Sequence, residues 1–137
     1  MTDRQDQVTV YVDTSFLLAA TAPDEPQHAA AVRWLSRHPG SLLTSVLAEV
    51  EAGRALARRA AGPSLQAAAE RRLAAGELVD VTAEIRAEAV RVVPTSVRSL
   101  EALHVATALV AGLQEFASVD VRQQVAAEKA GLHLATP

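Results

Sequence analysis

The sequence predicts an α/β fold in which helices flank a short, mainly parallel central sheet of four to five strands. Short β-rich runs alternate with longer helical patterns, so consecutive strands need crossover connections. Apolar residues make up 50% of the chain but aromatic residues only 3%, which favours closely packed helices around a small sheet. The length of 137 residues fits a single domain over 1–137, with 1–7 expected to be a disordered tail.

The predicted strands are short. The first, at 8–12, alternates Val with Thr and Tyr, which is typical of a buried strand. Later strands are expected at 41–44, 77–81, 115–120 and 132–134. Ligand sites in such sheets lie beyond the C-terminal ends of the strands. Two acidic residues, Asp13 and Asp120, fall at predicted strand ends.

The predicted helices are bounded by proline, glycine and capping residues. Pro39 with Gly40 ends one helix, Gly76 ends another, and Pro94 separates two more. The expected ranges are 15–20, 27–37, 45–60, 64–75, 82–92, 96 or 99 to 112, and 121–130.

The acids at the strand ends have two interpretations. Either could simply cap the helix that follows, and Asp120 with Gln123 has the spacing of a capping box. Alternatively both acids are metal ligands, because a capping carboxylate still offers its other oxygen to a cation. The hydroxyl groups expected beside such a site are those of Thr14, Ser15 and Ser118.

Two acids in helix 45–60 differ in their helical neighbours. Glu49 shares its face with apolar and small residues, so we expect it to point inward, with an acid that reaches water from the helix edge as the alternative. Glu51 shares its face with Arg54 and Arg58, so we expect it to be exposed and to form salt bridges. Glu49 is therefore the predicted site residue.

The apolar segment "SLEALHVATALVAG" contains two more candidates. Glu101 could be a ligand, or it could complement the helix dipole from the first turn. His104 could bind a metal, but a single histidine on an apolar helix is more often a buried hydrogen-bonding residue.

These acids together predict a metal site. Clustered carboxylates repel one another unless a divalent cation neutralises them. The chain has no cysteine, and carboxylate oxygens suit Mg²⁺ or Mn²⁺. Metal-assisted attack of water on a phosphodiester is the chemistry that uses such a site, which predicts a nuclease.

Four segments resemble, in order and spacing, the motifs of PIN-domain ribonucleases, and most closely the VapC-type toxins of bacterial toxin–antitoxin pairs. They are "YVDTSFLLA", "TSVLAEVEAGRAL", "VRSLEALHVATALVAG" and "FASVDVRQQVAAEKAGLHL". The third motif usually carries Asp where this chain has Glu101, which could change metal preference or weaken catalysis.

The resemblance implies a PIN-like three-layer sandwich with Mg²⁺- or Mn²⁺-dependent endoribonuclease activity and a 3′-hydroxyl product. It implies a type II toxin–antitoxin system, with a homodimer inhibited by a small cognate antitoxin. The residues to which it gives catalytic and metal-binding roles are Asp13, Glu49, Glu101 and Asp120.

RNA binding requires local positive charge, because the formal net charge of the chain is −3. The densest basic cluster could contact RNA phosphates or the antitoxin. Alternatively, it is a solvent-exposed helix face whose charges balance those of nearby acids. The scarcity of aromatic residues argues against base stacking as the main contribution to RNA binding. The members of the cluster are Arg54, Arg58, Arg59, Arg71 and Arg72.

Two other functions fit parts of the sequence. An aspartyl-phosphate phosphatase would use Asp13 as nucleophile, but Ser15 stands where such enzymes want a second Asp. A weakly active or inactive interaction module acting through the antitoxin would explain the departure at Glu101. The polar, acidic N-terminus is not a signal peptide and no stretch reaches membrane-spanning length, so we expect a cytoplasmic protein without membrane contact.

Overall fold

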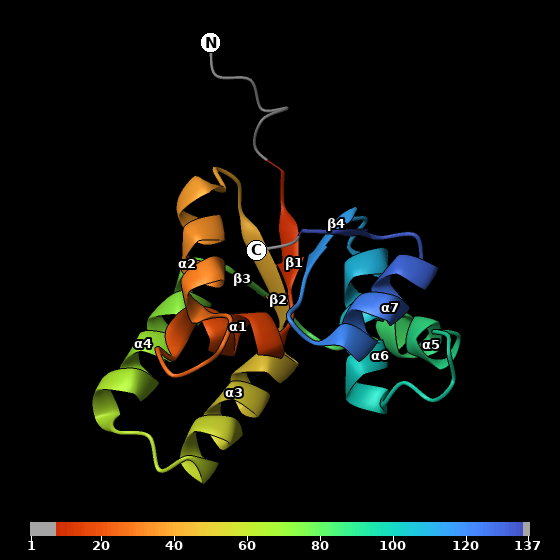
Figure 1. Ribbon diagram of the computed structural model, residues 1–137. Helices are drawn as coiled ribbons and strands as arrows, with labels where there is room; N and C mark the ends of the chain where they lie inside the picture. The colour runs from red at the N-terminus through yellow and green to blue at the C-terminus, as the bar shows by residue number, and fades with distance from the viewer. Residues whose placement is uncertain (1–7, 136–137) are drawn as a thin grey trace.

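The computed structural model describes residues 8–135 and is built around a five-stranded sheet, confirming the predicted fold class (Figure 1). The strand order is β3-β2-β1-β4-β5, and every neighbouring pair is parallel. The proposed tail at 1–7 lies outside the described residues. The strands are β1 (Val10–Val12), β2 (Leu42–Ser45), β3 (Glu77–Val79), β4 (Glu115–Ala117) and β5 (His133–Leu134).

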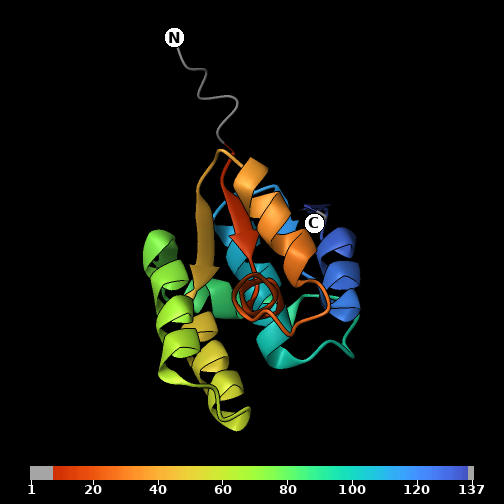
Figure 2. The same ribbon diagram turned by 60° about the vertical axis from the view of Figure 1, so that its left-hand side comes forward.

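Helices cover both faces of the sheet, as parallel strands with crossover connections require (Figures 1 and 2). In Figure 1, α1 to α4 lie on one side of the central strands, and α5 to α7 lie on the other. The helices are α1 (Thr14–Thr21), α2 (His28–Arg37), α3 (Val46–Arg58), α4 (Pro63–Ala75), α5 (Ala83–Val90), α6 (Ser99–Val110) and α7 (Val121–Lys129). No helix within residues 8–135 is long and apolar enough to cross a bilayer.

Alternation along β1 separates two cores. Tyr11 packs with Phe116 and Val105 on the face covered by α6 and α7. Val10 and Val12 pack on the opposite face, against α1 and α2. Tyr11 and Phe116 stack with ring centroids 5.1 Å apart, so the few aromatic side chains are concentrated at the centre of the sheet.

Two strands end earlier than the sequence pattern predicts, and local hydrogen bonding accounts for the early end of β4. The third strand stops at Val79 rather than 81, and β4 stops at Ala117 rather than 120. After Ala117 the backbone N–H of Val119 donates to Ser15 Oγ at 3.1 Å instead of to a neighbouring strand. The segment after β4 therefore leaves the sheet and bends toward the start of α1.

Candidate functional site

Asp13 lies at the C-terminal end of the central strand and caps α1. Its Oδ1 atom accepts hydrogen bonds from the backbone N–H of Phe16 at 2.9 Å and from the Ser15 hydroxyl at 2.8 Å. These bonds satisfy donors at the start of a helix that has no other side-chain cap. The side chain is 4% exposed, so a carboxylate is held in a nearly dry position at the sheet edge.

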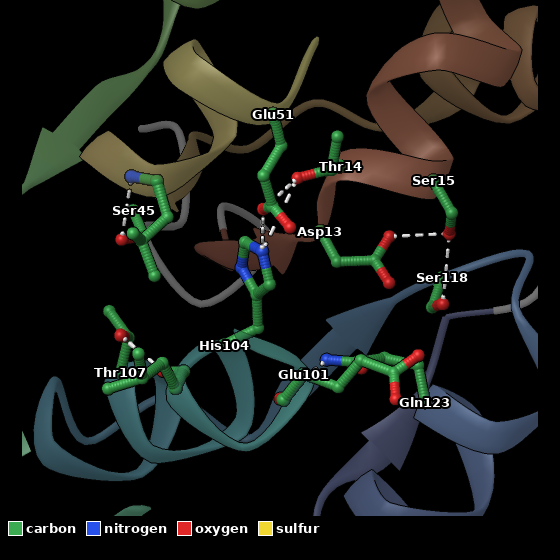
Figure 3. A network of polar contacts seen from close by, with 12 residues as sticks. Asp13, Thr14, Ser15, Ser45, Glu51, Glu101, His104, Thr107, Ser118 and Gln123 are labelled. Carbon is green, nitrogen blue, oxygen red and sulfur yellow. Dashed lines mark hydrogen bonds and ion pairs between the residues drawn. The ribbon is translucent and has the colours of Figure 1, made fainter. Parts of the chain in front are cut away.

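Two serines join the ends of β1 and β4. Ser15 Oγ and Ser118 Oγ lie 3.2 Å apart, and Ser118 Oγ accepts from the backbone N–H of Asp120 at 3.0 Å. Figure 3 shows Ser15 linked by dashed lines to Asp13 on one side and to Ser118 on the other. The hydroxyl groups expected beside Asp13 are therefore in contact with the chain that positions Asp120.

Asp120 caps α7, as its sequence context predicts. Its Oδ1 accepts from the backbone N–H of Arg122 at 2.9 Å and of Gln123 at 3.2 Å. The side chain of Gln123 does not complete a capping box, because its Nε2 donates to the backbone carbonyl of Glu101 at 3.0 Å. Gln123 instead ties α7 to the first turn of α6.

Glu51, and not Glu49, is the α3 acid that faces the site. The helix begins after Ser45, whose hydroxyl caps it by accepting from Leu47 N–H. Glu51 Oε1 then accepts two hydrogen bonds of 2.7 Å, from Thr14 Oγ1 and from His104 Nε2. Figure 3 shows Glu51 and His104 directed at one another, with Thr14 beside them.

The predictions for both α3 acids are wrong about orientation. Glu49 is exposed and lines a depression between α3 and α4, away from Asp13. Glu51 forms no salt bridge with Arg54 or Arg58 among residues 8–135. The face of α3 that carries Ala48 and Ala52 packs on α1 and α4, and this packing turns Glu51 toward α6.

His104 is a buried hydrogen-bonding residue, as expected. It is 3% exposed and its Nδ1 atom contacts the hydroxyl of Tyr11. Because a carboxylate only accepts, Nε2 carries the proton that it donates to Glu51, so in the neutral ring Nδ1 accepts from Tyr11. The buried tyrosine thus fixes which nitrogen faces the acid.

Glu101 lies at the N-terminus of α6, three residues before His104. Its Oε1 accepts from the backbone N–H of Arg98 at 3.2 Å, so it caps its own helix. The side chain is half-buried, and Figure 3 shows it on the same side of α6 as His104, near Gln123.

One pattern is common to the acids at this edge. The protein donates hydrogen bonds to a single oxygen of each, namely Oδ1 of Asp13 and Asp120 and Oε1 of Glu51 and Glu101. Within residues 8–135, the second oxygen of each acid makes no such bond. Each carboxylate is therefore held in place while keeping lone pairs available for a ligand.

The donor set fits a hard divalent cation that keeps part of its water shell. No three acidic or histidine side chains within residues 8–135 are close enough together to form a closed cage. Mg²⁺ typically binds through one or two carboxylates together with waters and substrate phosphates, so a closed cage is not required. Oxygen ligands without cysteine suit Mg²⁺ or Mn²⁺.

The two best-placed acids have opposite pKa shifts. Burial raises the pKa of Asp13, and the nearby charge of His104 with the local donors offsets this only in part. Burial also acts to raise the pKa of Glu51, but the hydrogen bonds from His104 and Thr14 outweigh it, and the net pKa is lowered. Glu51 is thus ionised readily, whereas burial disfavours the ionised form of Asp13.

The predicted basic cluster is divided by the fold. Arg59 pairs with Asp24 and Glu25 at 2.8 and 2.9 Å. Arg71 and Arg72 line a separate pocket formed with α1, α2 and the sheet. Only Arg54 and Arg58 lie beside the acids, in a depression that also contains Glu51.

Comparison with known proteins agrees with this architecture. The PIN domain family matches residues 10–129. Ribonuclease VapC46 of Mycobacterium tuberculosis strain ATCC 25618 / H37Rv is 34% identical over 131 residues, covering 93% of this chain and 97% of the relative. VapC20 of M. tuberculosis, described as a sarcin-ricin loop cleaving toxin, superposes with a TM-score of 0.77 at 26% identity, over 93% of this chain and 99% of that one.

A more distant structure supports the fold alone. VapBC2 from Rickettsia felis, bound to a promoter DNA fragment, matches with a TM-score of 0.69 at 11% identity, over 93% and 97% of the two chains. The five-stranded parallel sheet and the family match over most of the chain together identify a PIN domain. The chain belongs to the PIN-domain family, and within it to the VapC-type ribonucleases of toxin–antitoxin systems.

Proposed function

We propose that the protein is a Mg²⁺- or Mn²⁺-dependent endoribonuclease and the toxin of a type II toxin–antitoxin pair. The observation that carries the proposal is the half-satisfied state of the acids: each has one oxygen held by protein donors and another left for a ligand. We propose Asp13, Glu51, Glu101 and Asp120 as the candidate ligands, of which one or two would bind the ion directly and the others through its waters. Glu51 replaces Glu49 in this assignment because only Glu51 faces Asp13's helix.

The residues at this edge have two proposed roles, as metal ligands and as groups that position those ligands. Asp13 offers an oxygen from the end of β1 and Asp120 offers one from the start of α7, while Glu51 and Glu101 approach from α3 and α6. Thr14 and His104 hold Glu51, and Ser15 holds Asp13. A bound divalent cation would supply a water of lowered pKa and would compensate the charge that develops on the phosphodiester.

The proposed partners follow from the relatives. VapC20 is described as cleaving the sarcin-ricin loop, and a structure from Klebsiella pneumoniae that matches with a TM-score of 0.64 is described as a toxin–antitoxin complex. We therefore propose a structured or single-stranded RNA as substrate, a small cognate antitoxin as inhibitor, a homodimer as the active form and the cytoplasm as the place of action. An inactive interaction module would share the fold but not the metal-dependent cleavage.

The phosphatase alternative loses its support. An aspartyl-phosphate enzyme needs a free nucleophilic carboxylate and a second acid two positions on. Here Ser15 occupies that position and donates a hydrogen bond to Asp13 Oδ1. The serine acts as a positioning group and has no acid to offer.

The test uses the purified full chain, freed of antitoxin, with mixed tRNA, rRNA and mRNA in Mg²⁺ or Mn²⁺. We expect metal-dependent cleavage that EDTA abolishes and that Asp13→Asn removes without unfolding the domain. If neither metal supports cleavage and neither raises the melting temperature, the nuclease proposal fails and the interaction module is favoured. Phosphate release from p-nitrophenyl phosphate would favour the phosphatase.

A further inference from the structure

A depression of about 290 Å³ lies beside Glu51. It lies between α3 and the first turn of α6. Its lining combines one acid, two arginines and three aliphatic residues, which are Glu51, Arg54, Arg58, Leu47, Val50 and Leu100. The depression is thus continuous with the proposed metal-binding carboxylate.

Arg54 and Arg58 stand one helical turn apart and are both exposed. Like charges at this spacing repel one another, so the pair favours an anion placed between them. Glu51, the acid that lines the same depression, accepts hydrogen bonds from His104 and Thr14, and it makes no ion pair with either arginine within residues 8–135. The two guanidinium groups therefore remain available to a ligand.

The chemistry of the lining selects a phosphodiester. Guanidinium groups bind phosphate oxygens through paired hydrogen bonds. Val50 and Leu100 are 57% and 46% exposed, and their aliphatic surfaces suit the carbon face of a ribose. The depression contains no aromatic side chain, so it offers no stacking platform for a base.

We propose that Arg54 and Arg58 form a seat for a phosphate next to the one that is cleaved, so that one RNA strand runs from the carboxylate site along α3. This inference rests on the proposed nuclease function and names the contact that directs the strand across the site. It also selects two arginines from a larger basic cluster, because Arg59 is paired with acids and Arg71 and Arg72 line another pocket.

The test measures RNA binding by the full chain carrying Asp13→Asn, which keeps the RNA intact. The probe is a short fluorescein-labelled single-stranded RNA of mixed sequence, titrated at several salt concentrations. Arg54→Ala/Arg58→Ala should weaken binding several-fold at low salt and reduce the slope of log K against log[salt] by about 0.7, since the two arginines hold one phosphate and each phosphate contact on a single strand contributes about 0.7.

The matched control is Arg71→Ala/Arg72→Ala, which removes the same charge from another helix and should leave the slope unchanged. Thermal melting of both double variants checks that they fold. An equal loss in the control would show general charge attraction and overturn the seat, as would an unchanged slope in Arg54→Ala/Arg58→Ala. No binding by the Asp13→Asn parent would overturn it as well.

Two further outcomes separate this proposal from the others. If polyglutamate binds with the same dependence on Arg54 and Arg58, the seat belongs to an acidic protein segment and the RNA proposal is wrong. Cleavage by the chain with Asp13 intact is measured in parallel. If the chain with Asp13 intact cleaves RNA but the arginine variants bind RNA normally, only the phosphate seat is contradicted. If RNA binding depends on the arginines but the chain with Asp13 intact does not cleave RNA, only the nuclease function is contradicted.

Discussion

Glu51 Oε1 lies 2.7 Å from His104 Nε2, although 53 positions separate the two residues in the chain. The contact joins α3 to α6 at the edge of the sheet where Asp13 is buried. His104 is in turn held by the hydroxyl of Tyr11, whose pKa burial raises well above its ordinary value, so the tyrosine stays protonated. The orientation of an acid in the site thus depends on a pair of side chains in the core.

His104→Ala should weaken Mn²⁺ binding by about 10–100-fold, because groups that orient a metal ligand typically contribute that much. Isothermal titration calorimetry on the RNA-free protein measures this directly, apart from activity. His104→Gln retains an N–H donor and should recover part of the affinity. The control is His133→Ala, since the His133 side chain is 73% exposed and lies on β5. Equal Mn²⁺ affinity in wild type and His104→Ala would contradict the positioning role.

Glu51→Gln and Glu49→Gln form a matched pair, because both remove one negative charge from α3 two residues apart. Glu51→Gln should lower metal-dependent RNA cleavage by about 100-fold or more, whereas Glu49→Gln should keep most of the wild-type rate. Initial rates at saturating Mg²⁺ provide the comparison. The reverse ranking would restore Glu49 as the site residue.

The two α3 acids also show where sequence reasoning reaches its limit. At 3.6 residues per turn, Glu49 and Glu51 lie about 80° to either side of the stripe formed by Ala48 and Ala52. Helical periodicity therefore predicts the same burial for both acids and cannot show which of them points into the site. The choice depends on which flank faces α6, and that is set by contacts between distant parts of the chain.

Other features depended on local signals and were therefore predictable. The capping positions of Asp13 and Asp120 follow from apolar runs that stop at a capping residue, and both caps are present, although β4 itself ends at Ala117. The parallel sheet follows from the alternation of strands with helices. The link between Tyr11 and His104 had no local signal, because a tyrosine inside a strand and a histidine inside a helix each look like ordinary core residues.

Asp13→Asn should raise the melting temperature of the metal-free protein at neutral pH by about 2 °C or more. Burial raises the pKa of Asp13 in the folded state, so between the unfolded and folded pKa values the native protein binds more protons than the unfolded chain. The stability of the wild type therefore falls as pH rises through that window, whereas the stability of Asp13→Asn does not change for this reason, because Asn does not titrate. Asn remains a good helix cap, so α1 keeps its start.

Differential scanning calorimetry from pH 4 to pH 8 tests this sign. The advantage of Asp13→Asn should be small at the acidic end and should grow until the folded-state carboxyl is fully ionised. The control is Asp24→Asn, which removes a charge from an exposed side chain. A variant less stable than wild type at every pH would show that the charge on Asp13 is compensated in the absence of metal.

Divalent metal should reverse the order of stability between these two proteins. If Mg²⁺ or Mn²⁺ binds the free oxygens of the acids, it stabilises the native state by an amount that grows with the ratio of metal concentration to Kd. Metal at about 100 times Kd adds roughly 2.7 kcal/mol, which exceeds the expected gain from Asp13→Asn. Wild type should then melt at a higher temperature than the variant, and EDTA should return both to their metal-free values. Equal shifts in wild type, Asp13→Asn and Glu51→Gln would place the metal elsewhere on the protein.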